Sequence, residues 1–108
     1  MRIFWSEPAI EQLEEVRELH LRRAIFRAVM GLVQFPKKGP RPPELSLYPE
    51  LDSPHPLREL IFPGLCRLFY RLDEKKGIVR VVGIAFRGQD VSRSWLEEAM
   101  RGLGTGRE

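Results

Sequence analysis

The sequence predicts a small α+β domain with an N-terminal strand, a two-helix hairpin, a three-stranded antiparallel meander and a C-terminal helix. Three observations predict it. Two apolar stripes at helical spacing occupy the first third of the chain, three strand-like runs joined by tight turns lie between residues 57 and 86, and another helical stripe follows. Because 108 residues supply one hydrophobic core, residues 1–108 are expected to form a single domain.

The chain begins with a strand-prone run over residues 2–5, which is followed by a helix start signal. Ser6 is a favourable N-cap, and Pro8 is tolerated in the first helical turn. One apolar stripe starts at Ile10 and a second at Leu21. The shift between the stripes predicts a break at residues 19–22, but no Gly or Pro separates them, so one long helix is the alternative.

A proline-rich segment follows the helices. Phe35 and Pro36 are predicted to end the second helix, and residues 37–56 hold six of the nine prolines. We therefore expect a loop over residues 36–56 that belongs to this domain and is not a linker to another one.

The three strand-like runs predict a meander. Pro63-Gly64 and the polar residues 73–77 are typical of hairpin connections. Side chains alternate across a strand, so one face of the middle run is apolar and the other carries Arg67, Phe69 and Arg71. For an arbitrary sheet, such arginines would lie on a solvated outer face. Apart from Arg80, the run over residues 78–86 is apolar on both faces, which indicates a central strand.

The last helix is predicted from a stripe that includes Trp95, Leu96 and Leu103, with Asp90 or Ser92 as its cap. Ser94 and Glu97 offer an alternative capping box. Glycines at 102, 104 and 106 predict a frayed tail over residues 102–108.

Composition restricts the class of protein. Hydrophobic residues at 43% and charged residues at 31% are typical of a globular domain, and no apolar run approaches the roughly 20 residues of a membrane span. The start lacks the apolar region of a signal peptide, so we expect a cytoplasmic protein. Cys66 is the single cysteine, which excludes an intramolecular disulfide and a cysteine-rich metal site.

Charge is unevenly distributed. The formal net charge is +3, and residues 57–93 contain eight Lys or Arg against four Asp or Glu. A sheet that presents several cations is suited to an anionic ligand, and the basic balance permits binding to nucleic acid without proving it.

Several segments in this order carry a family resemblance. They are Ser6-Glu7-Pro8-Ala9, Leu32-Val33-Gln34-Phe35-Pro36, Leu57-Arg58-Glu59-Leu60, Gly64-Leu65-Cys66-Arg67-Leu68-Phe69-Tyr70 and Ile84-Ala85-Phe86-Arg87-Gly88-Gln89-Asp90. In this order the chain resembles the RelE/ParE superfamily of toxins from bacterial type II toxin–antitoxin pairs, over most of its length. The strand entry and the helix after Phe86-Arg87 are also similar to the HigB branch.

The resemblance implies a toxin that pairs with a cognate antitoxin protein. Its ribonuclease members, the mRNA interferases, cut mRNA on the ribosome without a metal or a small-molecule cofactor, by attack of a 2′-hydroxyl on its own phosphodiester. In that interpretation Arg67 and Arg87 match the arginines that hold the phosphate, and Arg58 is a third candidate. Such an enzyme would be a metal-independent endoribonuclease with the RNA as its binding partner.

The departures from the family pattern concern the acid and the base. Leu60 replaces a lysine of the ribonucleases, and Arg93 or Trp95 stands where they have a terminal tyrosine or histidine. Arginine is a poor general base, which leaves His55 and Glu59 as candidates. A lone histidine in a proline-rich loop is more often a plain surface residue.

Three functions therefore remain open at the level of the sequence. The first is a ribosome-associated mRNA endoribonuclease, for which an Arg67→Ala variant would lose growth inhibition. The second is a ParE-like inhibitor that binds DNA gyrase without catalysis, and the third is a degenerate member that only binds its antitoxin. The aligned arginines favour the ribonuclease.

Overall fold

A computed structural model describes residues 1–101 of the chain. Its elements are the strand β1 (Arg2–Trp5), the helices α1 (Glu7–Glu14) and α2 (Leu19–Met30), the 3₁₀ turns η1 (Gly31–Val33), η2 (Pro43–Ser46) and η3 (Pro49–Asp52), the strands β2 (Leu57–Phe62), β3 (Cys66–Asp73) and β4 (Ile78–Phe86), and the helix α3 (Arg93–Arg101). The predicted frayed tail and Leu103 lie outside the described residues.

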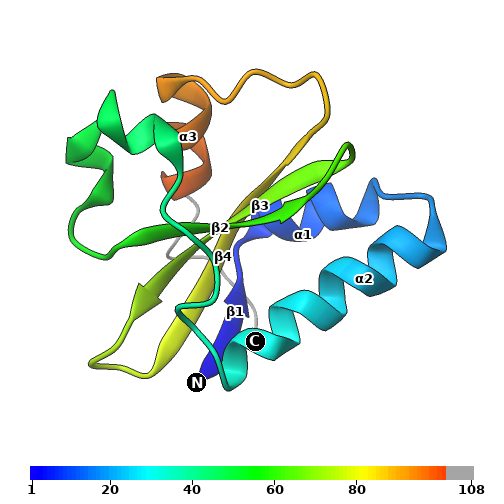
Figure 1. Cartoon of the computed structure of the whole chain (residues 1–108), viewed down its shortest axis with the longest axis horizontal. Helices are drawn as coiled ribbons and strands as arrows, with labels where there is room; N and C mark the ends of the chain where they lie inside the picture. The colour runs from blue at the N-terminus through cyan, green and yellow to red at the C-terminus, as the bar shows by residue number, and fades with distance from the viewer. Residues whose placement is uncertain (102–108) are drawn as a thin grey trace.

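The four strands form one sheet in the order β1-β4-β3-β2 (Figure 1). The predicted meander of β2, β3 and β4 is confirmed, and β1 adds to it as a fourth strand, parallel to β4. β4 is central, as its apolar character on both faces predicts. The α+β architecture agrees with the prediction from sequence.

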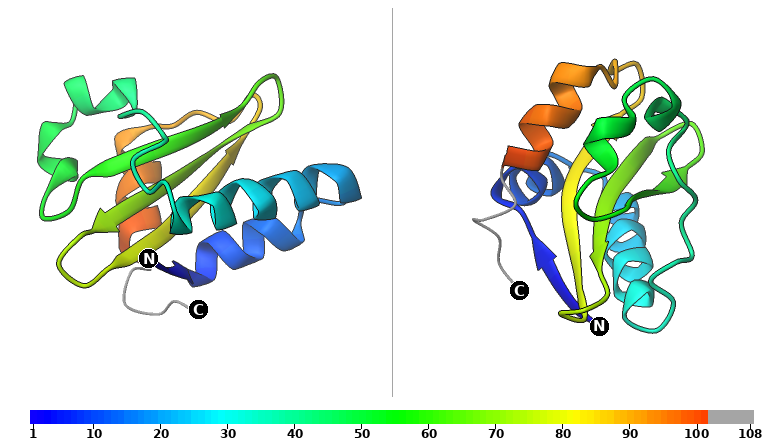
Figure 2. Two further views of the ribbon diagram at one scale, coloured as in Figure 1. Left: turned by 60° about the horizontal axis from the view of Figure 1, so that its bottom comes forward. Right: turned by 90° about the vertical axis from the view of Figure 1, so that its left-hand side faces the viewer.

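The two faces of the sheet have different covers, and Figure 2 shows α2 on one side and α3 on the other. The face of Cys66, Leu68 and Tyr70 packs against α1 and α2. The opposite face, around Phe69, packs against α3 and against apolar side chains of residues 43–53. We call residues 43–53, which contain η2 and η3, the strap.

The helical start signals form as expected. The Oγ atom of Ser6 accepts a hydrogen bond from the Ala9 amide, and that of Ser92 accepts one from the Trp95 amide. The hairpin of two helices is confirmed over one long helix, but its break precedes the predicted position. α1 ends at Glu14 and α2 begins at Leu19, because the Glu18 carboxylate caps the second helix by accepting from two backbone amides.

The solvated outer face that an arbitrary sheet would give its arginines does not form at Arg71. Arg71 is only 3% exposed, because the strap and α3 cover this face of the sheet. The proline-rich loop is therefore an ordered layer of the domain over much of its length, and it determines what the sheet can present to a ligand.

We predict opposite effects for alanine at two glycines. A Cβ atom at Gly39 would lie 2.2 Å from the Glu59 carbonyl oxygen, so Gly39→Ala must displace the segment that precedes the strap and should cost more than about 2 kcal/mol of unfolding free energy. Gly31 has nothing within 4 Å and a helical backbone, so Gly31→Ala should be neutral or stabilising. Chemical denaturation checks both, and equal stability of the two variants would contradict the packing described here.

Candidate functional site

The strap is built from two similar turns. Pro43-Glu44-Leu45 and Pro49-Glu50-Leu51 each begin a 3₁₀ turn with a proline in its first positions, where the missing amide costs no hydrogen bond. The leucines pack with Tyr48 against the core cluster that contains Phe69. This packing places both glutamates near arginines.

Arg67 binds two carboxylates. Glu44 of the strap accepts from both terminal nitrogens of Arg67 at 2.8 and 2.7 Å, and Glu59 of the neighbouring strand accepts from Nε at 2.9 Å. The guanidinium also lies over the Phe69 ring, 4.9 Å from its centroid. Arg67 lowers the pKa of Glu44, and the two carboxylates, Glu44 foremost, raise the pKa of Arg67. The sheet arginine is therefore already occupied by internal anions.

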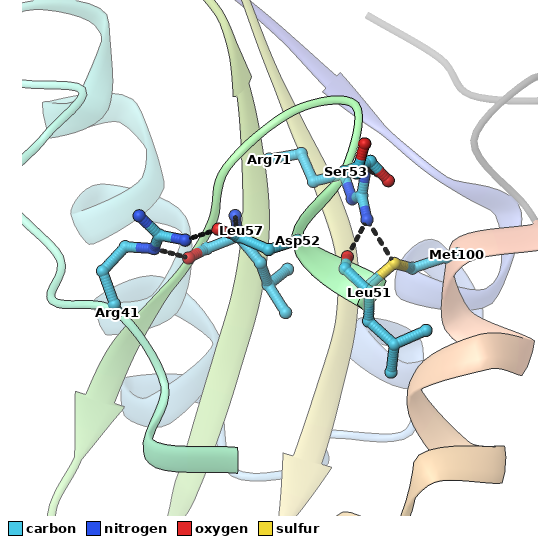
Figure 3. A network of polar contacts seen from close by, with 7 residues as sticks. All are labelled: Arg41, Leu51, Asp52, Ser53, Leu57, Arg71 and Met100. Atoms are coloured by element: carbon cyan, nitrogen blue, oxygen red, sulfur yellow. Dashed lines mark hydrogen bonds and ion pairs between the residues drawn. The ribbon is translucent and has the colours of Figure 1, made fainter. Parts of the chain in front are cut away.

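Arg71 holds the other end of the strap (Figure 3). Its guanidinium donates to the carbonyl oxygens of Leu51 and Ser53 and contacts the Met100 sulfur at 2.7 Å. Burial lowers the pKa of Arg71, because desolvation disfavours its charged form. The bonds to carbonyls partly compensate that cost, so Arg71 joins the strap to the sheet and to α3.

Further polar contacts close the strap. Arg41 pairs with Asp52, whose second oxygen accepts from the Leu57 amide at 2.8 Å (Figure 3). On the outside, Glu50 pairs with Arg93 of α3 at 2.8 Å. Four arginines thus bind the strap, namely Arg41, Arg67, Arg71 and Arg93, and the strap covers much of this face of the sheet.

Arg58 lies on the opposite face from Arg67. It pairs across the strands with Tyr70, whose side chain belongs to the core beneath α1 and α2. Its guanidinium donates to the carbonyl oxygens of Lys37 and Gly39 at 3.3 and 2.7 Å. The structure therefore does not bring Arg58 together with Arg67, because Arg58 shares the face of Tyr70, and Tyr70 lies an odd number of positions from Arg67 in β3.

The two candidate bases, His55 and Glu59, do not lie where they could act on a phosphodiester bound by Arg67. His55 lies 3.4 Å from Asp73, which is at the far end of β3 from Arg67, about 20 Å along the strand at ordinary rise. Glu59 is only 1% exposed, and both of its carboxylate oxygens accept from Arg67. Neither side chain can approach an RNA hydroxyl beside Arg67 in this arrangement.

Arg87 is the candidate that remains open. It is exposed, directly follows β4, and makes no side-chain hydrogen bond or ion pair with residues 1–101. Arg67 and Arg87 do line one hollow of about 270 Å³ at this end of the sheet. The structure therefore brings these two arginines to one hollow, and of the two only Arg87 lacks a counter-ion among the described residues.

A second surface lies on the side of the sheet that α1 and α2 cover, which we call the helix side. A groove of about 530 Å³ between β1, α1 and α2 is lined by apolar side chains, among them Phe26 and Met30, which are 52% and 44% exposed. The adjoining hollow shares both residues and is bordered by Arg22, Arg23 and Arg27. Such a patch on a small domain is typical of a protein-binding surface.

Comparison with known proteins was informative at the level of the family. The family model for the ParE toxin of the type II toxin–antitoxin system parDE matches residues 3–91. The chain belongs to this toxin family. The crystal structure of the isolated E. coli RelE toxin is similar in fold, with a TM-score of 0.60 and 14% identity over 93% of this chain and 96% of that one. A search of curated proteins found no match.

This ParE-family toxin is therefore the toxin component of a type II pair, as its sequence indicates, and the family implies an antitoxin partner. None of the helices within residues 1–101 combines the length and apolar character needed to cross a bilayer. In the same residues, His, Cys, Asp and Glu form no group of three that could hold a metal ion.

The toxin contains site residues that sequence reasoning missed, namely Glu44 and Glu50. The repeated Pro-Glu-Leu, six residues apart, was an available signal, because each copy sets a glutamate next to a leucine in a short turn. Its partners were not deducible, since Glu44 and Arg67 are 23 residues apart in the chain.

We predict that Glu44 stabilises the toxin in a pH-dependent manner. Because the pKa of Glu44 is lowered in the folded state, its stabilisation is present above the unfolded value of about 4.3 and is lost as the pH falls through the lowered value. Glu44→Gln should therefore lower the melting temperature at pH 7 and reduce the loss that the wild type shows on acidification to about pH 3.

The matched control is Glu50→Gln in the sister turn. Its ion pair with Arg93 is about half exposed, so the change should move the melting temperature little at either pH. Identical pH profiles for the Glu44→Gln and Glu50→Gln variants would contradict the assigned role of Glu44.

Proposed function

We propose that this toxin arrests growth by binding a protein target, DNA gyrase, without cleaving RNA. The single observation that supports a non-catalytic toxin most strongly is the saturation of Arg67 by Glu44 and Glu59. Gyrase as the target comes from the resemblance to ParE-like inhibitors and agrees with the ParE family match.

The chemistry of RNA cleavage supports the same choice. Attack of a 2′-hydroxyl on a phosphodiester needs a base, an acid and cations around one phosphate. Here Arg67 is neutralised, Arg58 is on the other face, and His55 is at the other end of β3. A protein that only binds its target does not need these groups to converge.

The ribonuclease remains the alternative, and one observation favours it. Arg67 and Arg87 line the same hollow, so displacement of Glu44 would place two guanidinium groups near one phosphate. A degenerate member that only binds its antitoxin would show neither activity.

We predict the outcome of a direct comparison. After induction of the toxin in cells, plasmid DNA should lose negative supercoiling while primer extension on total RNA finds no codon-linked cleavage. Purified toxin should likewise inhibit supercoiling by purified gyrase. Codon-linked cleavage with normal supercoiling would refute the proposal in favour of the ribonuclease, and growth arrest without either effect would refute both.

We further propose that the antitoxin covers the groove on the helix side. The strap and α3 cover much of the face of the sheet that carries Arg67 and Arg71, whereas the groove is open and largely apolar. Arg22 donates to the carbonyls of Val16 and Glu14, and Arg23 and Arg27 lie beside it, so positive charge borders the groove. An amphipathic helix with acidic flanks is the complementary occupant.

The antitoxin proposal predicts a selective loss of binding. Phe26→Asp places a charge in the apolar groove and should weaken capture of the co-expressed antitoxin by about tenfold or more. Phe35, which is 64% exposed outside this groove, provides the control, and Phe35→Asp should bind normally. Affinity would be measured by titration calorimetry, and equal affinity of the two variants would place the antitoxin elsewhere.

A further inference from the structure

The hollow that contains Arg87 lies where β3 begins and β4 ends, next to the tip of the β2–β3 hairpin. Its lining includes Ile61 and Leu65, which are 56% and 53% exposed although both are large apolar residues. A hollow that shows two such side chains to solvent is suited to the apolar side chain of a partner.

Two hydrogen-bonded turns, at residues 62–65 and 86–89, line this hollow. In the hairpin, the Leu65 amide donates to the Phe62 carbonyl at 2.9 Å, and Gly64 has a φ of 74°, which favours glycine. After β4, the Gln89 amide donates to the Phe86 carbonyl at 3.0 Å, and the Gln89 side chain accepts from the Phe86 amide at 2.9 Å.

One bond joins the two turns, from the Arg87 amide to the Leu65 carbonyl at 2.9 Å. The shape of the hollow is therefore set by the backbone before any partner arrives. A preformed site loses little conformational freedom on binding, which favours affinity.

Charge indicates the chemistry of the partner. Arg87 supplies one exposed cation that has no ion pair within residues 1–101, whereas Arg67, on the wall, is shared by Glu44 and Glu59. A nucleic-acid backbone carries a regular series of phosphates and would meet these carboxylates. A single carboxylate beside an apolar group fits one free guanidinium and the exposed leucine and isoleucine.

We propose that this hollow binds the toxin's protein target, by taking a segment that presents an apolar side chain next to a carboxylate. This inference rests on the proposed function insofar as the target is a protein. It separates two surfaces of the molecule, since the antitoxin groove is on the helix side and the target site is at the end of the sheet.

The test uses purified toxin, purified DNA gyrase and the antitoxin. Leu65→Asp, Ile61→Asp and Arg87→Glu should each raise the concentration for half-maximal gyrase inhibition by about tenfold or more. Each should leave antitoxin affinity unchanged, which also shows that the variant is folded. Matched controls are Leu47→Asp on the strap, where Leu47 is 71% exposed, and Arg17→Glu in the exposed connection between α1 and α2.

The outcomes are distinct. If the wild type inhibits gyrase and the three variants match the controls, the inference is overturned while the proposed function stands. If Arg87→Glu loses activity but both apolar substitutions keep it, the hollow binds a phosphate-like anion and the inference is again overturned. If the wild type does not inhibit gyrase, the proposed function fails, and two further readouts decide. Loss of growth inhibition in all three variants, with no codon-linked RNA cleavage by the wild type, supports a protein target at this site. Retained growth inhibition, or RNA cleavage by the wild type, overturns the inference.

Discussion

The guanidinium of Arg67, shared between Glu44 and Glu59, is the interaction on which the functional surface depends. Glu59 is nearly inaccessible and fixed in the sheet, while Glu44 arrives from the strap, so the three charged groups connect a loop to a strand. Removing one partner would leave a partly buried charge uncompensated, which costs far more than the intact pair contributes. The ion pairs therefore favour a closed strap whenever all three groups are charged.

Closure of the strap has consequences for the whole molecule. Arg71 binds the last carbonyls of the strap, and Arg93 binds Glu50 from outside, so the face of the sheet that carries cations is used internally. Among the described residues, the apolar groove beside α2 and the hollow near Arg87 are open to partners. Two separate surfaces of this kind would suit the proposed function, in which the antitoxin and a protein target bind different parts of the molecule.

The sequence was sufficient for the elements and for the order of the meander. Alternation in β3 places Cys66, Leu68 and Tyr70 in the core, as observed, and Ser6 and Ser92 act as helix caps through local bonds. The side of the sheet on which Arg58 lies could also be deduced from the sequence, because a tight turn at Pro63-Gly64 sets the register that pairs Arg58 with Tyr70. The same register places Arg58 on the other face of the sheet from Arg67, so these two side chains do not meet.

Other features could not be obtained from local patterns. Parallel addition of β1 to β4 and the closing of the strap over Phe69 join residues that are distant in the chain. Propensity and periodicity describe neighbours within a few positions, so they give no information on whether a distant glutamate such as Glu44 will meet a sheet arginine. For the same reason, the sequence identified Arg67 as a candidate cation but not Glu44 as its partner.

The most direct test of the central claim is a double-mutant cycle between Glu44 and Arg67. Unfolding free energies of the wild type, Glu44→Gln, Arg67→Gln and the double variant would be compared at pH 7. A bidentate, partly buried pair should give a coupling energy of about 1 to 3 kcal/mol. A coupling energy within experimental error of zero would show that Arg67 does not hold the strap, which contradicts the account.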